Sequence, residues 1–300
     1  MSRNRTRGIW LMIAAVAVFA AQDGFSRHLA GEYNTLMIVM VRYWAFAGFV
    51  IFLALRRPEG FRAAIRTARP LTHAIRGTLL VAEVCLIVWG YTLIGLIESH
   101  AVFAICPLLI AALSGPLLGE KVGWQRWAAI GAGLVGVLII LRPTSGVFSW
   151  PALLPFASAL MFALYSILTR LSARDEPVFP SFFWAGVIGA AFMTVLGLPN
   201  WEAVQGADLG FLAVYVSLSI LSHWLLTKCY EQVEANVVQP YAYLQIVFVT
   251  GVGIVVYDET LAPAVALGTA VVVGAGLYSL WQERQRNTVP AAAPSQGTGA

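Results

Sequence analysis

The stretch Glu98–Pro143, ESHAVFAICPLLIAALSGPLLGEKVGWQRWAAIGAGLVGVLIILRP, holds two long apolar runs. Pro107 interrupts the first run, and a short charged turn, Gly119-Glu120-Lys121, separates it from the second. Each run comes close to the roughly 20 residues that a helix needs to cross the hydrocarbon core of a membrane. We therefore predict two membrane-spanning helices joined by a short turn.

The same plan returns 139 residues further along the chain, where Glu259 stands at the position equivalent to Glu120. Pro240–Val256 is apolar, Asp258-Glu259 is charged, and Pro263–Trp281 is apolar again. A repeat of this length over membrane spans is typical of transporters, because a substrate path forms between two halves related by symmetry. The chain therefore looks like one unit used twice.

The composition is that of an integral membrane protein. Of 300 residues, 59% are hydrophobic and 11% charged, and the mean hydropathy is +0.76. The net charge of +4 does not indicate nucleic-acid binding, because the basic residues sort by membrane side instead of clustering on one exposed face. Cys85, Cys106 and Cys229 each sit in an apolar run without metal-ligand spacing, so we expect no metal and no cofactor.

Ten segments qualify as membrane spans. They lie at approximately 9–28, 35–55, 74–96, 99–118, 124–141, 150–171, 179–198, 209–230, 237–256 and 262–281. With ten spans, nearly all Lys and Arg fall in the links on one side, and only Arg27 and Arg142 fall on the other. This skew predicts that both termini lie in the cytoplasm.

Five spans per half is an odd number, so the second half must enter the membrane from the opposite side. We therefore predict an all-α membrane protein whose ten transmembrane helices form two inverted five-helix repeats around a central cavity. The expected parts are a cytoplasmic N-terminus over 1–8, repeats over 9–143 and 144–283, and a disordered cytoplasmic tail over 284–300.

Pro107 in span 4, Gly119-Glu120 at its cytoplasmic end, and the two inverted halves resemble the ten-span, two-repeat (EamA) type of the drug/metabolite transporter superfamily. The second half carries the counterpart Tyr243–Phe248 and then Asp258-Glu259. The resemblance covers nearly the whole chain and is closest to bacterial exporters of amino acids and related metabolites. It implies that spans 4 and 9 line the central cavity and that the protein sits in the bacterial inner membrane.

Two positions depart from the family pattern. Ile246 stands in span 9 where the family commonly has Pro, and Asp258 replaces the Gly that precedes Glu259. We therefore expect span 9 to be straighter than span 4.

Ionisable side chains at membrane depth are costly, and they are functional candidates by default. Glu83 lies near the midplane of span 3, where it could bind a substrate ammonium group or carry a proton, which makes protons a candidate coupling ion. The alternative is a protonated carboxyl bonded to a neighbouring helix. His223 lies on span 8, the counterpart of span 3, and the alternative for it is a hydrogen-bonded packing residue.

Asp23 and Arg42 lie at similar depth on the adjacent spans 1 and 2. A buried ion pair between them, with a structural or gating role, is one hypothesis. The alternative is that Arg42 extends toward the membrane surface while Asp23 caps a helix end.

The remaining binding candidates are polar and aromatic side chains of spans expected to face the cavity. They are Trp89 on span 3, Ser99, His100 and Phe103 on span 4, Tyr165 on span 6, and Tyr241, Tyr243 and Gln245 on span 9. Aromatic residues near span ends are expected to form interfacial belts instead, namely Tyr91, Trp150 and Trp281.

The expected function is a secondary transporter that exports small metabolites by alternating access, with apolar or aromatic amino acids as the leading substrates. The sequence has no Walker motif that would indicate ATP-driven transport. Carriers of drugs, nucleobases, nucleosides or lipid-linked substrates remain alternatives. A membrane enzyme acting on lipid-linked substrates is a further alternative, although the sequence has no HExxH or GxSxG motif.

Overall fold

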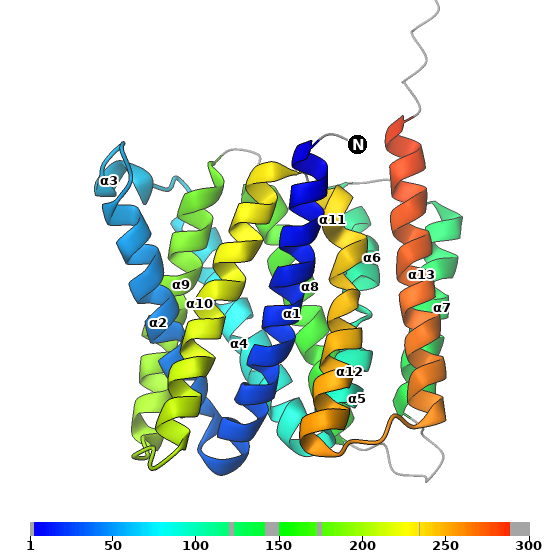
Figure 1. Ribbon diagram of the computed structural model, residues 1–300. Coiled ribbons are helices and arrows are strands. Elements are labelled where there is room, and N and C mark those ends of the chain that lie inside the picture. The colour runs from blue at the N-terminus through cyan, green and yellow to red at the C-terminus, as the bar shows by residue number, and fades with distance from the viewer. Residues whose placement is uncertain (1–2, 120–122, 142–149, 173–175, 234, 289–300) are drawn as a thin grey trace, which may run out of the picture.

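The computed structural model describes residues 3–119, 123–141, 150–172, 176–233 and 235–288. Its helices run alongside one another in a single bundle, and the described chain begins and ends at the same end of that bundle (Figure 1). We call this the upper end, as drawn, and the opposite one the lower end. Glu120 and Arg142 lie outside the described residues.

The described helices supply ten candidate membrane spans, which confirms the predicted all-α fold of ten transmembrane helices. The helices are α1 (Arg3–Glu32), α2 (Thr35–Leu55), α3 (Phe61–Ala64), α4 (Pro70–Ile94), α5 (Leu96–Phe103), α6 (Cys106–Leu118), α7 (Trp124–Leu141), α8 (Leu153–Ser172), α9 (Val178–Gly197), α10 (Asp208–Gln232), α11 (Ala235–Ala242), α12 (Leu244–Tyr257) and α13 (Pro263–Thr288). The part of the expected tail that precedes residue 289 is helical, and the rest lies outside the described residues.

Spans 4 and 9 are both discontinuous. Span 4 consists of α5 and α6, with the break at Ala104 and Ile105, and span 9 consists of α11 and α12, with the break at Tyr243. At each break the backbone makes a bond to the third preceding carbonyl, from Leu108 to Ile105 at 2.9 Å and from Ile246 to Tyr243 at 3.1 Å. The two breaks are 139 residues apart, like the repeats.

Span 9, expected to be straighter than span 4, is also interrupted, because α11 ends at Ala242 and α12 begins at Leu244. Pro240 lies inside α11, three residues before the break. A proline in a helix removes one backbone donor and clashes with the preceding turn. Pro107 follows the break in span 4, as a proline that disturbs its preceding turn would, whereas Pro240 precedes the break in span 9 and does not explain it in this way.

Helix packing follows the inverted symmetry. The pair α1 and α10 (spans 1 and 8) has its mate in α8 and α4 (spans 6 and 3), and both pairs are in extensive contact. The contact between α1 and α12 corresponds by the same symmetry to the contact between α8 and α6. The pairs α2 with α9 and α7 with α13 are their own mates, and α7 and α13 form one edge of the bundle (Figure 1).

Gly95 separates span 3 from span 4 and moves the start of span 4 to Leu96, three residues earlier than expected. Its φ of +89° is a conformation that side chains with a Cβ rarely adopt, which explains a glycine here. The turn aims the first N–H groups of α5 at the link between α12 and α13, as described below.

Candidate functional site

A buried polar cluster joins four helices in the lower half of the bundle. Asp23 on α1 lies 3.1 Å from His100 Nε2 on α5 and accepts a hydrogen bond of 3.2 Å from the Gln245 amide on α12. The Tyr91 hydroxyl on α4 lies 3.0 Å from the same His100 nitrogen, and the two rings stack at 5.3 Å. Because α5 and α12 belong to the two discontinuous spans, this cluster ties both of them to α1.

The predicted ion pair between Asp23 and Arg42 is not formed. No ion pair within 4 Å joins these two described residues, and Asp23 uses His100 and Gln245 instead. Arg42 lies farther away, within electrostatic range of both Asp23 and Glu83. The two residues therefore face different neighbours.

Glu83 on α4 is 7% exposed and faces α8. The Ser158 hydroxyl lies 3.1 Å from the Glu83 carbonyl oxygen and 3.4 Å from its carboxyl group. Among the described residues, no ion pair within 4 Å involves Glu83. Its carboxyl group is thus held in the bundle interior by one long side-chain hydrogen bond, with the positive charge of Arg42 in range.

A row of aromatic rings runs from this cluster along α5 and α8. His100 and Phe103 are 6.5 Å apart, Phe103 and Phe162 5.9 Å, and Phe162 and Tyr165 5.7 Å, measured between ring centroids. The Arg76 guanidinium lies 5.0 Å from the centre of the Tyr165 ring at the upper end of the row. The predicted Phe103 and Tyr165 therefore belong to one continuous aromatic surface.

His223 takes a different place from the one expected of a partner to Glu83. Its Nδ1 lies 2.8 Å from the Ser219 carbonyl on its own helix, α10, to which it donates. Its ring packs 4.7 Å from Phe46 and 5.3 Å from Phe19, measured between centroids. These contacts place His223 among aromatic side chains of α1, α2 and α9, outside the Asp23 cluster.

The other predicted lining residues are dispersed. The Tyr243 hydroxyl is buried against α13 beside Gly276, and Ser99 is fully buried; neither hydroxyl has a hydrogen-bond partner among the described residues. Tyr241 packs on the apolar group that includes Met12. Trp89 is 38% exposed and lies apart from the cluster residues. Of the span 9 candidates, only Gln245 reaches the Asp23 cluster.

The lower end is closed by Glu259, which follows α12. Its two carboxylate oxygens accept hydrogen bonds of 2.8 and 2.9 Å from the N–H groups of Leu96 and Ile97 at the start of α5. Arg27 on α1 forms an ion pair with the same carboxylate and lies over the Tyr257 ring, 4.1 Å from its centre. We call this arrangement the lower lock.

The upper end is closed by Glu176, which lies between α8 and α9. Its carboxylate accepts hydrogen bonds from the Thr67 hydroxyl at 2.8 Å, the Ala68 N–H at 2.6 Å and His73 Nε2 at 2.9 Å. Burial alone would raise the pKa of Glu176, but these hydrogen bonds outweigh burial and hold the pKa below its ordinary value. We call this arrangement the upper lock.

Arg76 fixes the protonation state of His73 in the upper lock. Arg76 Nη1 lies 2.9 Å from His73 Nδ1, and a guanidinium can only donate, so Nδ1 is an acceptor. The imidazole proton is therefore on Nε2, which faces Glu176, and the ring is uncharged. Arg76 also donates to the Thr169 hydroxyl at 3.0 Å, which connects the lock to the aromatic row.

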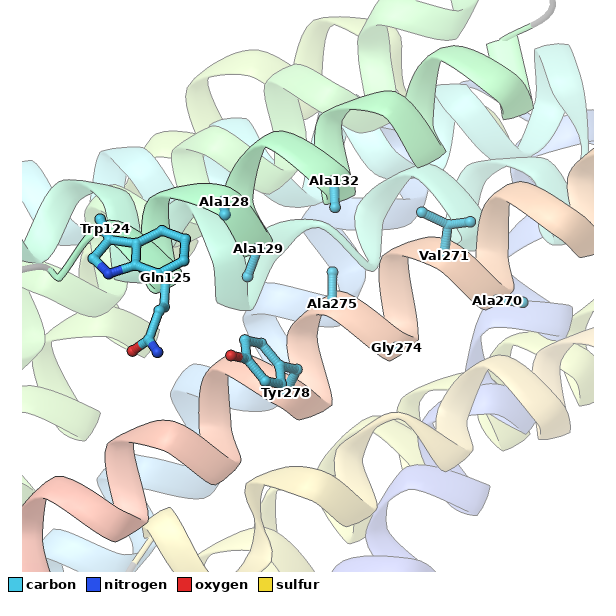
Figure 2. A pocket seen from close by; sticks show the side chains of 10 residues that line it. All are labelled: Trp124, Gln125, Ala128, Ala129, Ala132, Ala270, Val271, Gly274, Ala275 and Tyr278. Carbon is cyan, nitrogen blue, oxygen red and sulfur yellow. The ribbon is translucent and has the colours of Figure 1, made fainter.

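A separate hollow of about 490 Å³ lies between α7 and α13 at the edge of the bundle (Figure 2). Small side chains line most of it, with Trp124, Gln125 and Tyr278 toward its upper end. It is remote from the Asp23 cluster. Within the described residues, no group of three or more His, Cys, Asp or Glu side chains could hold a metal ion.

Sequence reasoning missed Tyr91 and the two locks. Tyr91 was expected in an interfacial belt, because it lies near the end of span 3, yet it is 3% exposed and packs on His100. Glu259 was recognised as the equivalent of Glu120, but its role as an acceptor for α5 was not. The position of Gly95 directly before α5 indicates such an acceptor, because the first N–H groups of a helix have no partner within the helix and can bond to a carboxylate.

Comparisons with known proteins agree with this architecture. A model of the EamA-like transporter family matches residues 6–142 and again 149–281. An S-adenosylmethionine uptake transporter of Rickettsia felis is 24% identical over 92% of each chain. A riboflavin transporter of Rhizobium johnstonii is 28% identical over 97% of this chain and 96% of its own.

One solved crystal structure has the same fold, with a TM-score of 0.63 at 19% identity, over 97% of this chain and 99% of that one. The family model covers both halves of the chain, and the structure has ten candidate spans with the helix breaks and packing of an inverted repeat. The chain belongs to the EamA-like transporter family.

Proposed function

We propose that this protein is a secondary transporter of the bacterial inner membrane that carries an amino acid, or a metabolite with an amino-acid head group and an aromatic part. Substrate passes between the two halves by alternating access. The two discontinuous spans support this proposal, because transporters built from inverted repeats form their substrate sites where such helices break near the midplane.

The observation that carries the proposal is the aromatic row beside two buried acids. The row from His100 to Tyr165 offers ring faces to a planar group. Asp23 contacts His100 at one end of the row, and Glu83 contacts Ser158, which lies four residues before Phe162 on α8. A carboxyl group inside a membrane bundle is costly unless it meets a partner. A substrate ammonium group provides such a partner for Glu83, whose carboxyl group makes one long side-chain hydrogen bond.

S-adenosylmethionine fits this description, because it combines an amino-acid head group, a cationic sulfonium and a purine ring. Relatives from Rickettsia felis and Rickettsia prowazekii are named for its uptake. Aromatic amino acids such as tryptophan are smaller molecules with the same combination of head group and ring. We therefore place both in one substrate class.

Riboflavin is the second candidate substrate, supported by the aromatic row and by the riboflavin transporters among the relatives. It has a large planar ring system but no ammonium group, so its recognition would use ring stacking more than Glu83. Dependence on Glu83 therefore separates the two substrate classes.

The resemblance to exporters favours outward transport, whereas the relatives are named for uptake. A secondary transporter runs in either direction according to its gradients. Protons are the candidate coupling ion, and either Glu83 or the pair of Asp23 and His100 would carry them. A pH-sensitive dye trapped in proteoliposomes reports proton movement during substrate exchange.

The test is counterflow in proteoliposomes with L-tryptophan, L-phenylalanine, S-adenosylmethionine and riboflavin. We expect exchange of the zwitterionic substrates, and a loss of at least about tenfold in Glu83→Gln, because the ion pair to the ammonium group is lost. Glu202→Gln is the matched control, since Glu202 is exposed in the link before α10. Full activity in Glu83→Gln and Glu83→Ala would contradict the role of Glu83, and no exchange of any compound would contradict the proposed substrates.

A further inference from the structure

A polar seam lies between α1, α2 and α10 in the lower half of the bundle. Tyr215, Ser219 and Ser222 occupy one face of α10, at spacings of four and three residues. Gln22 and Ser26, four residues apart, face them from α1, and the Ser222 hydroxyl donates to the Gln22 carbonyl oxygen at 3.4 Å. His223 on α10 also packs against Phe19 of α1 and Phe46 of α2, which confirms that the three helices meet here.

Most polar atoms of this seam have no partner. The Gln22 amide nitrogen and the hydroxyls of Ser26, Ser219 and Tyr215 make no hydrogen bond of ordinary geometry within the described residues. All four side chains are at most 1% exposed. A buried polar atom without a partner costs about 1–3 kcal/mol, so a ligand that supplied hydrogen bonds here would be favoured.

Arg42 on α2 completes the seam. The Tyr215 hydroxyl lies beside both Ser26 and Arg42. Arg42 forms no ion pair within 4 Å among the described residues, and Glu83 is its neighbour within electrostatic range on the side of α4. The Arg42 side chain is partly exposed, unlike the other members of the seam.

The groups of the seam are of one chemical kind. A guanidinium and an amide nitrogen only donate hydrogen bonds, and hydroxyl groups can donate. Such a set suits a carboxylate, which accepts at both oxygens and pairs with arginine in a bidentate manner.

We propose that Arg42, with Tyr215, Ser26 and Gln22, binds the carboxylate of the substrate, while Glu83 binds its ammonium group. This inference rests on the proposed zwitterionic substrate. The separation of Arg42 from Glu83 then has a reason: the two charges flank the head group of the substrate instead of neutralising each other directly. The ring of the substrate lies along the aromatic row of α5 and α8.

The alternative is that Arg42 serves only to balance the charges of Asp23 and Glu83 inside the bundle. A purely structural Arg42 would affect every substrate equally. A carboxylate-binding Arg42 affects only substrates that have a carboxylate. Comparing a substrate that has a carboxylate with an analogue that lacks it therefore distinguishes the two roles of Arg42.

The experiment measures counterflow of L-tryptophan and of tryptamine, which lacks the carboxylate, by the wild type, Arg42→Lys, Arg42→Gln and Tyr215→Phe. In Arg42→Gln we expect KM for L-tryptophan to rise roughly ten- to hundredfold and KM for tryptamine to change less than about twofold. Arg42→Lys retains the charge and recovers part of the loss. Arg62→Gln, an exposed arginine of α3, is the matched control. Equal losses for both compounds would overturn the proposal.

A second measurement does not depend on transport. The wild-type protein in detergent is heated with indole-3-propionate, a carboxylate without an ammonium group, and with tryptamine. We expect indole-3-propionate to raise the unfolding temperature in the wild type and not in Arg42→Gln. No stabilisation of the wild type by any aromatic carboxylate would overturn the carboxylate site. If carboxylates stabilise the protein but no zwitterion is transported, the proposed function fails and the anion site stands.

Discussion

At the lower end, Glu259 accepts hydrogen bonds from two N–H groups at the start of α5 and forms an ion pair with Arg27. At the upper end, Glu176 accepts hydrogen bonds from a hydroxyl group, one backbone N–H and an uncharged imidazole. Both carboxylates connect the link of one half to the other half. The lower lock holds a full ion pair, because arginine stays charged at every physiological pH. In the upper lock, no lysine or arginine among the described residues pairs with the Glu176 carboxylate within 4 Å. We expect the upper end to open more readily than the lower end.

The largest effect is expected from Glu259→Ala. Breaking a largely buried ion pair leaves Arg27 without its partner and removes the cap of α5, so the free energy of unfolding should fall by about 3 kcal/mol or more. Unfolding in detergent, followed by circular dichroism, measures this loss. Glu202→Ala, an exposed acid of a lower link, is the control. A loss equal to that of the control would show that the lower lock does not stabilise the closed end.

Glu176→Gln should have a smaller effect, about 1–2 kcal/mol at neutral pH, because it weakens hydrogen bonds without separating an ion pair. The folded-state pKa of Glu176 is lowered, so its stabilisation is present above the ordinary value of 4.5 and is lost as pH falls through the folded-state pKa. Unfolding temperatures of the wild type and the variant should therefore converge in acid. Glu59→Gln, with only a 3.9 Å contact to Arg57, is the control. A difference that persists undiminished in acid would rule out this role.

The smallest effect is a difference between two glycine variants. Gly95 and Gly60 have φ values of +89° and +84°, so alanine strains the backbone similarly at both positions. At Gly95 the added Cβ would also lie 2.5 Å from Glu259 Oε1, whereas at Gly60 nothing lies within 4 Å. We expect Gly95→Ala to destabilise the protein by about 1 kcal/mol more than Gly60→Ala, since it displaces the Glu259 cap. Equal unfolding temperatures would mean that the lower lock tolerates this displacement.

The ten spans and their inverted repeat could be predicted because they depend on apolar length and on the side to which charges sort. That Asp23 and Glu83 lie inside the bundle was equally predictable, and they are 6% and 7% exposed. The direction in which each side chain points around its helix was not, since it depends on which helices pack together. Asp23 therefore meets His100, which comes from a distant span, instead of Arg42. The break in span 9 could not be predicted, because Ile246 stands at the position equivalent to Pro107.

The crossing of α7 and α13 has a mechanical consequence. A Cβ at Gly136 would lie 2.9 Å from the Gly268 carbonyl oxygen, and one at Gly268 would lie 2.6 Å from that of Gly136, so the two backbones touch at this point. In the repeat, Ala275 is the equivalent of Gly136, and Ala129 is the equivalent of Gly268. These two alanines line the hollow between α7 and α13 (Figure 2). Sliding one helix along the other would press a side chain into the backbone, whereas turning about the glycine contact would not. The glycine contact therefore fixes how closely the two helices of this edge approach each other.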